Sequence, residues 1–219
     1  DKIMSNFGES SGRKDPFLHF YEDFLAQYNP SKRKARGVWY TPEAVVQFIV
    51  RAVDEVLIEE FELPLGLASS AKVTIDWDTG QTNKRGKPIV QAREVHRVQI
   101  LDPATGTGTF LAETIKQIAP KVKATAAGAW SSYIENNLIS RLHGFELLMA
   151  SYTMCHLKLA MALKELGYTP TDKHPRLGIY LTNALEEGQR SEQTLWAVLN
   201  QSLTEEARQA NKIKRDLPV

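Results

Sequence analysis

The residues whose types and spacing are best suited to binding a ligand lie in one short stretch, residues 102–108, with the sequence DPATGTG. An acidic side chain followed by two glycines in G-x-G spacing is typical of a ligand-binding turn between a buried strand and a helix. The glycines let the backbone turn sharply and let a ligand approach it closely. The carboxylate of Asp102 can accept a hydrogen bond from a cationic or hydroxyl-bearing ligand. The stretch therefore predicts a small-molecule site at a strand–turn–helix corner.

Two common phosphate-binding motifs are incomplete at this turn. A dinucleotide fingerprint, G-x-G-x-x-G, needs a third glycine where this chain has Leu111. A P-loop needs a lysine and a Ser or Thr directly after its last glycine, and no lysine follows Gly108 closely. The pattern therefore disfavours a ligand held by its phosphates, NAD included.

Two further polar side chains follow predicted strands. Glu146 ends the run 142–146, which is read as a strand, and a carboxylate at that place can accept both hydroxyls of a ribose. Asn183 follows the next run and has the donor and acceptor to recognise the amino group and a ring nitrogen of adenine. The alternatives are an exposed strand end for Glu146 and an ordinary turn residue for Asn183.

The elements that must position these residues alternate between strand and helix. Such alternation predicts an α/β fold with a parallel sheet and helices on both faces, with ligands at the carboxyl ends of the strands. The expected strands are 98–101, 142–146 and 178–181. The expected helices are 109–122, 130–139, 151–166, 192–203 and 205–213.

Two helices and a hairpin are expected before this core. The first helix, 15–28, has an aromatic face and ends at Asn29 and Pro30. The second runs from Pro42 to about Phe61, with Thr41 as its N-cap and Pro42 as its first residue. A β-hairpin is expected from 72–77 and 87–92. The buried stripe predicted for the second helix is Val45, Phe48, Ile49, Ala52, Val53, Val56 and Leu57.

Composition narrows the class of protein. The chain has 219 residues, 42% of them hydrophobic, so it can bury a core. Its net charge is only +1, so its surface as a whole is not basic in the way expected of a domain that grips nucleic acid all over. The basic runs 32–36 and 212–215 are either solvated surface or phosphate contacts. One cysteine, Cys155, and histidines without ligand spacing predict no disulfide and no metal site. Without a signal peptide or membrane-length apolar run, we expect a cytoplasmic protein.

Four segments together resemble a known family. Residues 102–110, DPATGTGTF, resemble motif I of the S-adenosylmethionine (SAM)-dependent methyltransferases that act on amino groups of DNA, above all the N6 group of adenine. Residues 37–42, 142–147 and 179–185 resemble motifs X, II and III, in the order of the gamma arrangement. Residues 15–25 further resemble the large single-chain restriction–modification enzymes of type ISP, which fuse nuclease, helicase and methyltransferase.

This resemblance implies a Rossmann-like SAM-dependent methyltransferase fold, with an N-terminal helical segment and an inserted β-hairpin. It implies three parts: a helical segment and basic linker over 1–36, the motif X helix and hairpin over 37–98, and a SAM-binding core over 99–219. The cofactor implied is SAM, whose ammonium and carboxylate suit an aspartate and backbone N–H groups. The residues that would hold it are Tyr40, Thr41, Asp102, Pro103, Ala104, Gly106, Gly108, Glu146, Leu147 and Asn183.

The acceptor chemistry of the family is expected outside this chain. In these enzymes an [N/D/S]-P-P-[Y/F/W] motif after motif III binds the flipped adenine, and no such motif follows Asn183 here. The resemblance therefore implies an incomplete domain with no catalytic residue, cut from a longer protein. Double-stranded DNA would be bound mostly by other regions, including nuclease, helicase and target-recognition domains. The alternatives are a protein-glutamine or RNA N-methyltransferase, or a non-catalytic nucleic-acid-binding module.

Overall fold

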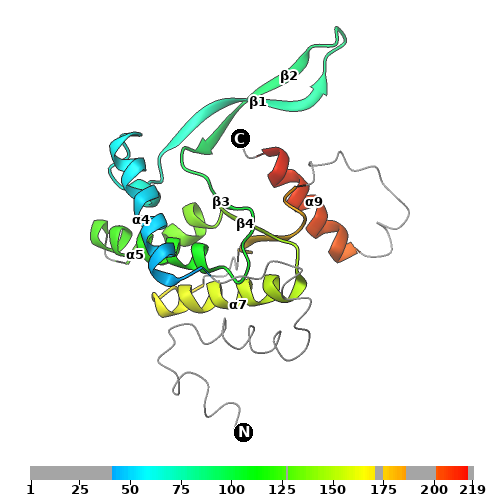
Figure 1. Cartoon of the computed structure of the whole chain (residues 1–219). Helices are drawn as coiled ribbons and strands as arrows, with labels where there is room; N and C mark the ends of the chain where they lie inside the picture. The colour runs from blue at the N-terminus through cyan, green and yellow to red at the C-terminus, as the bar shows by residue number, and fades with distance from the viewer. Residues whose placement is uncertain (1–40, 127, 171–174, 186–200, 217–219) are drawn as a thin grey trace.

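The computed structural model describes residues 41–126, 128–170, 175–185 and 201–216 (Figure 1). The predicted helix over 15–28, the basic run 32–36 and Tyr40 lie outside these residues. So does most of the helix predicted over 192–203. None of the described helices is long and apolar enough to cross a membrane.

A parallel sheet lies at the centre of the described part of the chain. Its strands are β3 (Ile100–Asp102), β4 (Leu142–Glu146) and β5 (Gly178–Leu181), in the order β3–β4–β5. The predicted parallel sheet is confirmed, and β4 and β5 have the predicted bounds. The first strand was predicted over 98–101, which is wrong by two residues at its start. Val98 is buried by packing, but the ladder begins where the N–H of Ile100 donates to the carbonyl of Arg141.

Helices cover both faces of this sheet, as predicted. Helices α5 (Thr109–Thr125) and α7 (Met149–Glu165) share the main core with Ile179 of β5. Successive strand residues point to opposite faces, so Tyr180 instead packs with Ala210 of α9 (Gln201–Asp216). Figure 1 shows α7 and α9 on opposite sides of β4. Helices therefore pack on both faces of β5, and the carboxyl edge of the sheet is the natural place for a ligand.

The segment before β4 differs from the continuous helix predicted over 130–139. It divides into a short helix, α6 (Trp130–Tyr133), and a π-helical turn, η2 (Ile134–Leu138). Ile134 and Leu138 are both buried in the main core. The segment is thus helical throughout, as predicted, but not a regular α-helix.

Helix α4 (Glu43–Glu59) begins one residue later than predicted. Pro42 occupies the N-cap position, and its carbonyl accepts hydrogen bonds from the N–H groups of Val45 and Val46 at 2.9 and 3.1 Å. No side chain caps the helix, so the prediction that Thr41 is the N-cap was wrong. An extended Pro42, with ψ of 138°, makes its own carbonyl the first acceptor of the helix.

The predicted buried stripe of α4 was also largely wrong. The buried side chains are Val46, Val50 and Asp54, spaced by four residues. Leu57 packs against the core as predicted. Asp54 is not part of the predicted stripe, yet its carboxylate is buried and has hydrogen-bond partners. The exposed members of the predicted stripe are Val45, Phe48, Ile49, Val53 and Val56.

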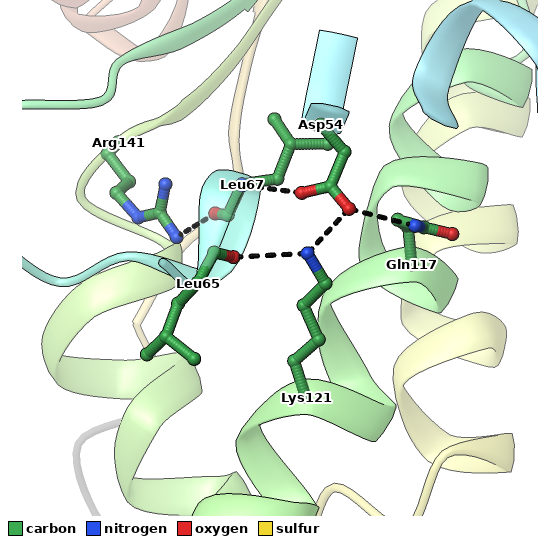
Figure 2. A network of polar contacts seen from close by, with 6 residues as sticks. All are labelled: Asp54, Leu65, Leu67, Gln117, Lys121 and Arg141. Carbon is green, nitrogen blue, oxygen red and sulfur yellow. Dashed lines mark hydrogen bonds and ion pairs between the residues drawn. The ribbon is translucent and has the colours of Figure 1, made fainter. Parts of the chain in front are cut away.

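The partners of Asp54 form a polar network that fastens α4 to the core (Figure 2). Its Oδ1 accepts a hydrogen bond from the backbone N–H of Leu67, at 2.8 Å, in the short helix η1 (Gly66–Ala68). Its Oδ2 accepts from Gln117 Nε2 at 2.9 Å and from Lys121 Nζ at 2.5 Å, both on α5. The helix that follows Thr41 is thereby held on the helix that follows the glycine turn.

This network predicts a specific pH dependence of stability. Burial raises the pKa of Asp54, but hydrogen bonds from Gln117, Lys121 and Leu67 outweigh it, so the pKa lies below 3.8. A carboxyl whose pKa is lowered on folding stabilises the fold above its unfolded pKa, and that stability is lost as pH falls through the folded pKa. We expect the free energy of unfolding to fall below about pH 4. Urea denaturation of the wild type and Asp54→Asn over about pH 3 to 7 measures this; identical pH profiles would contradict it.

The predicted hairpin is confirmed, with longer strands. Strands β1 (Lys72–Thr82) and β2 (Pro88–His96) pair antiparallel, with Lys72 opposite His96. The ribbon projects from the rest of the described chain (Figure 1).

Candidate functional site

The polar residues singled out in the sequence meet at the carboxyl edge of the sheet. Asp102 is the last residue of β3 and Glu146 the last residue of β4. The glycine turn leaves β3 and enters α5 at Thr109. This is the strand–turn–helix corner that the sequence predicts.

A buried threonine fastens the glycine turn to the neighbouring strand. Thr105 is 4% exposed, and its hydroxyl lies 3.0 Å from the carbonyl oxygens of both Asp102 and Phe145. Its backbone N–H also donates to the Phe145 carbonyl, at 3.0 Å. Sequence reasoning missed this role, because the acceptor on β4 is distant in the chain. A hydroxyl between the aspartate and the first glycine is the signal that could have indicated it.

The two glycines of the turn both have positive φ, but their surroundings differ. Gly106, at φ +56°, has no heavy atom within 4 Å of a Cβ built on it, so the turn is open to a ligand there. Gly108, at φ +83°, would place a Cβ 2.7 Å from Cys155 Sγ on α7. Gly108 therefore allows the turn to pack against α7, and Gly106 leaves space above the backbone.

Substitution at Gly108 separates backbone strain from steric conflict. Gly108→Ala is expected to cost about 2–4 kcal/mol of stability, from the left-handed backbone and from overpacking against Cys155. Gly128→Ala is the control, because Gly128 has the same φ of +83° with nothing within 4 Å; it should cost about 1–2 kcal/mol. Adding Cys155→Ala to Gly108→Ala should recover part of the loss in urea denaturation. Equal costs at the two glycines would contradict the conflict with Cys155.

Glu146 closes the site from the second strand. Its Oε2 accepts a hydrogen bond from the N–H of Gly106, and its Oε1 accepts from the N–H of Leu148, both at 2.7 Å. The structure thus brings Glu146 and Gly106 into direct contact. An ionised carboxylate has about four acceptor positions, so hydroxyl donors of a ligand can still be accepted.

Asp102 has one carboxylate oxygen that is buried without a hydrogen-bond partner among the described residues. Its Oδ1 accepts a hydrogen bond from the N–H of Ala104 at 3.1 Å. Its Oδ2 is buried and has no hydrogen-bond partner among the described residues. Burial, and to a lesser degree the nearby charge of Glu146, raises the pKa of Asp102, while the Ala104 bond opposes this. A buried acceptor without a donor is costly, and a cationic ligand group would satisfy it.

Asn183 follows β5 and makes the contacts of a turn residue. Its Oδ1 accepts from the N–H of Leu185 at 3.1 Å, and its carbonyl accepts from Lys214 Nζ at 2.5 Å. The N–H of Thr182 donates to the Glu146 carbonyl, which joins this turn to β4. The side-chain oxygen is therefore already engaged by the backbone.

The remaining predicted site residues are more exposed. Pro103 and Ala104 are exposed, and Leu147 is 64% exposed beside Glu146. Thr41 is partly exposed before α4. The structure thus brings together Asp102, the glycine turn and Glu146 as one unit. Thr41 precedes α4, which packs against α5, and among the described residues no hydrogen bond joins it to that unit.

Comparison with known proteins finds similarity to DNA methyltransferases and restriction enzymes. The N-6 DNA Methylase family model matches residues 12–61. A putative type II restriction enzyme and methyltransferase of Methanocaldococcus jannaschii is 24% identical over 163 residues, which cover 67% of this chain and 14% of the relative. The chain thus spans about a seventh of that relative. The predicted resemblance to N6-adenine DNA methyltransferases and type ISP enzymes is confirmed by these matches and those that follow.

Solved structures share the fold. The ATP-dependent type ISP restriction–modification enzyme LlaBIII bound to DNA has a TM-score of 0.59 and 24% identity, covering 94% of this chain and 12% of its own. A DrdV–DNA complex has a TM-score of 0.55 and 24% identity, covering 90% and 15%. A nuclease-deletion mutant of the type ISP enzyme LlaGI with a DNA substrate mimic has a TM-score of 0.53 and 22% identity, covering 90% and 13%. At these identities the likeness establishes the α/β fold alone.

Proposed function

We propose that this chain is the SAM-binding part of an N6-adenine DNA methyltransferase within a restriction–modification enzyme. The observation that carries the proposal is the buried, unpartnered Oδ2 of Asp102 beside the open turn at Gly106. The motif order and the family match over residues 12–61 support the same assignment. The core over 99–219 is then a Rossmann-like domain, with the parts 1–36 and 37–98 preceding it.

The residues at the sheet edge fit the chemistry of SAM. Asp102 offers a buried anionic acceptor to a cationic or hydroxyl donor, and Gly106 allows close approach to the turn. Glu146 holds that turn and keeps acceptor capacity for ribose hydroxyls. When bound, SAM supplies a methyl group on a sulfonium for transfer to a nitrogen. The other assigned contacts, from Tyr40, Thr41, Pro103, Ala104, Gly108, Leu147 and Asn183, remain part of this proposal.

The proposed acceptor is an adenine flipped out of duplex DNA. This part of the proposal is supported by the family match, by structures of two type ISP restriction–modification enzymes with DNA or a DNA substrate mimic, and by a DrdV–DNA complex. The chain spans only a small share of those relatives. We accordingly propose that acceptor binding and DNA cleavage belong to other parts of the complete enzyme.

Calorimetric titration with SAM tests the cofactor assignment. We expect one SAM site in the longest protein that contains this chain, and no comparable binding of NAD. Methyl transfer from labelled SAM to unmethylated duplex DNA by that protein tests the reaction. Absence of SAM binding would overturn the cofactor assignment, while methylation of RNA or protein in place of DNA would overturn the proposed substrate.

A further inference from the structure

The outer part of the β1–β2 ribbon has a charge unlike that of the rest of the chain. Between Asp78 and Glu94 lie four basic residues and no acidic one, whereas the whole chain has a net charge of +1. Three of the four are in the connection between the strands, and all four are exposed. These basic residues are Lys84, Arg85, Lys87 and Arg93.

The turn that presents these charges is well ordered by Asn83. Its side-chain Oδ1 accepts hydrogen bonds from the N–H groups of Arg85 and Lys87, at 2.9 and 3.1 Å. Its own N–H donates to the Lys87 carbonyl at 2.8 Å, and its carbonyl accepts from the N–H of Gly86 at 2.9 Å. The basic side chains therefore extend from a defined turn, which lowers the entropy lost when they bind a partner.

Side-chain contacts between β1 and β2 also stabilise the strands next to the turn. The guanidinium of Arg93 lies over the ring of Trp77, 4.8 Å from its centroid. Thr79 Oγ1 donates to the carbonyl of Ile89 at 2.8 Å, next to a register shift between Asp78 and Thr82. Such a shift increases the twist of a ribbon. The result is a twisted, basic arm that projects from the described chain (Figure 1).

The two strands of this arm have little to pack against. Most side chains of β2 are exposed, and the ribbon forms a separate sheet. An isolated two-stranded hairpin is marginally stable in water, so a partner that covers it would add stability. Its charge indicates an anionic partner, and the major groove of B-DNA, about 12 Å wide, admits a two-stranded β-ribbon.

We infer that the tip of the β1–β2 ribbon binds the phosphate backbone of duplex DNA through Lys84, Arg85 and Lys87. This deepens the proposed function, because it supplies a DNA contact within this chain. Lysine and arginine contacts to phosphate give affinity without sequence selection. Duplex RNA is a poorer partner, since the major groove of A-form helices is deep and narrow.

The first test compares two triple variants of the full 219-residue chain. Lys84→Gln/Arg85→Gln/Lys87→Gln removes the tip charges, and Lys116→Gln/Lys123→Gln/Lys164→Gln removes three exposed charges from α5 and α7. Binding to a labelled random-sequence DNA duplex is followed by fluorescence anisotropy between about 50 and 200 mM salt. We expect the tip variant to bind at least about tenfold more weakly, with a salt slope smaller by about 2–3, and the control to change less than about twofold.

Each other outcome counts against the inference. Equal weakening in both variants would show that net charge alone matters, and no weakening would show that the tip makes no contact. Failure of the unsubstituted chain to bind duplex DNA at the lowest salt would also overturn it. Circular dichroism confirms that the exposed substitutions leave the fold intact.

The second test locates the contact on the ribbon. Burial raises the pKa of the Cys155 thiol to about 12 and removes it from solvent, so an introduced surface cysteine can be labelled selectively. A fluorophore on Gln81→Cys is expected to respond to duplex DNA, and one on Glu165→Cys of α7 is not. An equal response at both positions, or a stronger response to duplex RNA than to DNA, would contradict the inference.

Titration with SAM separates this inference from the proposed function. The tip variant is expected to bind SAM as the wild type does, because the ribbon lies outside the glycine turn. Loss of SAM binding with normal DNA binding would overturn the cofactor site and leave the ribbon contact standing. Normal SAM binding, with no effect of the tip substitutions on DNA binding, would overturn the ribbon contact and leave the cofactor site standing.

Discussion

Replacement of Asp54 by alanine is expected to lower the free energy of unfolding by about 3 kcal/mol, at the lower end of values for breaking a buried ion pair. Asp54 is 3% exposed and accepts three hydrogen bonds. Its removal leaves the N–H of Leu67 and the amide of Gln117 without their acceptor. The Lys121 side chain is 25% exposed, so water partly compensates its ammonium group, which keeps the loss from being larger.

Urea denaturation measures this loss, and Glu55→Ala is its control. Glu55 is the next residue of α4 and is exposed, so its removal should change stability by less than about 0.5 kcal/mol. Similar losses for the two variants would show that the network of Figure 2 does not stabilise the fold.

A second substitution checks the same network from the other side. At Gly66, with φ of +53°, a Cβ would lie 2.1 Å from Asp54 Oδ1. Gly66→Ala should therefore be strongly destabilising on its own. It should cost less when Asp54→Ala is already present, because the two residues contact each other.

The sequence predicted the elements whose bounds depend on residues that are neighbours in the chain. The second and third strands of the sheet are short apolar runs that end at Glu146 and Leu181, and both have the predicted bounds. The glycine turn could be predicted because positive φ and close backbone approach are properties of the glycines themselves. The β-hairpin could be predicted because its turn residues lie between two β-prone runs.

The face of α4 could not be predicted in the same way. Hydropathy counts Asp54 as a residue of the water-facing side, yet it is buried because Gln117 and Lys121 compensate its charge. Those partners lie more than sixty residues further along the chain. A periodicity within one helix contains no information about them, so the apolar stripe was assigned to the wrong face.

The candidate site shows the same division. The sequence indicated Asp102, the glycines and Glu146 as separate ligand contacts. The structure adds that Glu146 accepts from the N–H of Gly106 and that Thr105 bonds to the strand of Glu146. These contacts depend on the parallel register of β3 and β4, which sets what lies opposite the turn. Residue types indicated which side chains lie at the sheet edge, and only the sheet pairing revealed how they are held together.

Replacement of Asp102 by asparagine is expected to weaken SAM binding by about 100-fold, which corresponds to about 3 kcal/mol for a lost charge-assisted hydrogen bond. The buried Oδ2 has no partner among the described residues, so a ligand donor would meet an acceptor already free of water. Calorimetric titration measures the change. Asp76→Asn, an exposed position on β1, is the control and should bind as the wild type does. Unchanged affinity in Asp102→Asn would contradict the assigned role.

The same substitution, Asp102→Asn, should stabilise the fold of the protein when no SAM is bound. Burial and Glu146 raise the pKa of Asp102, so its ionised form destabilises the folded state. A carboxyl of this kind contributes stability below its unfolded pKa and loses that contribution as pH rises through the folded pKa. Asparagine mimics the protonated acid, so Asp102→Asn should raise the melting temperature at neutral pH, by about 2–4 °C for each kcal/mol gained. The gain should vanish in acid, where Asp102 is itself protonated. A residue that binds its ligand tightly and strains the empty fold is expected at a functional site, whereas a merely structural aspartate would lose stability on the same change.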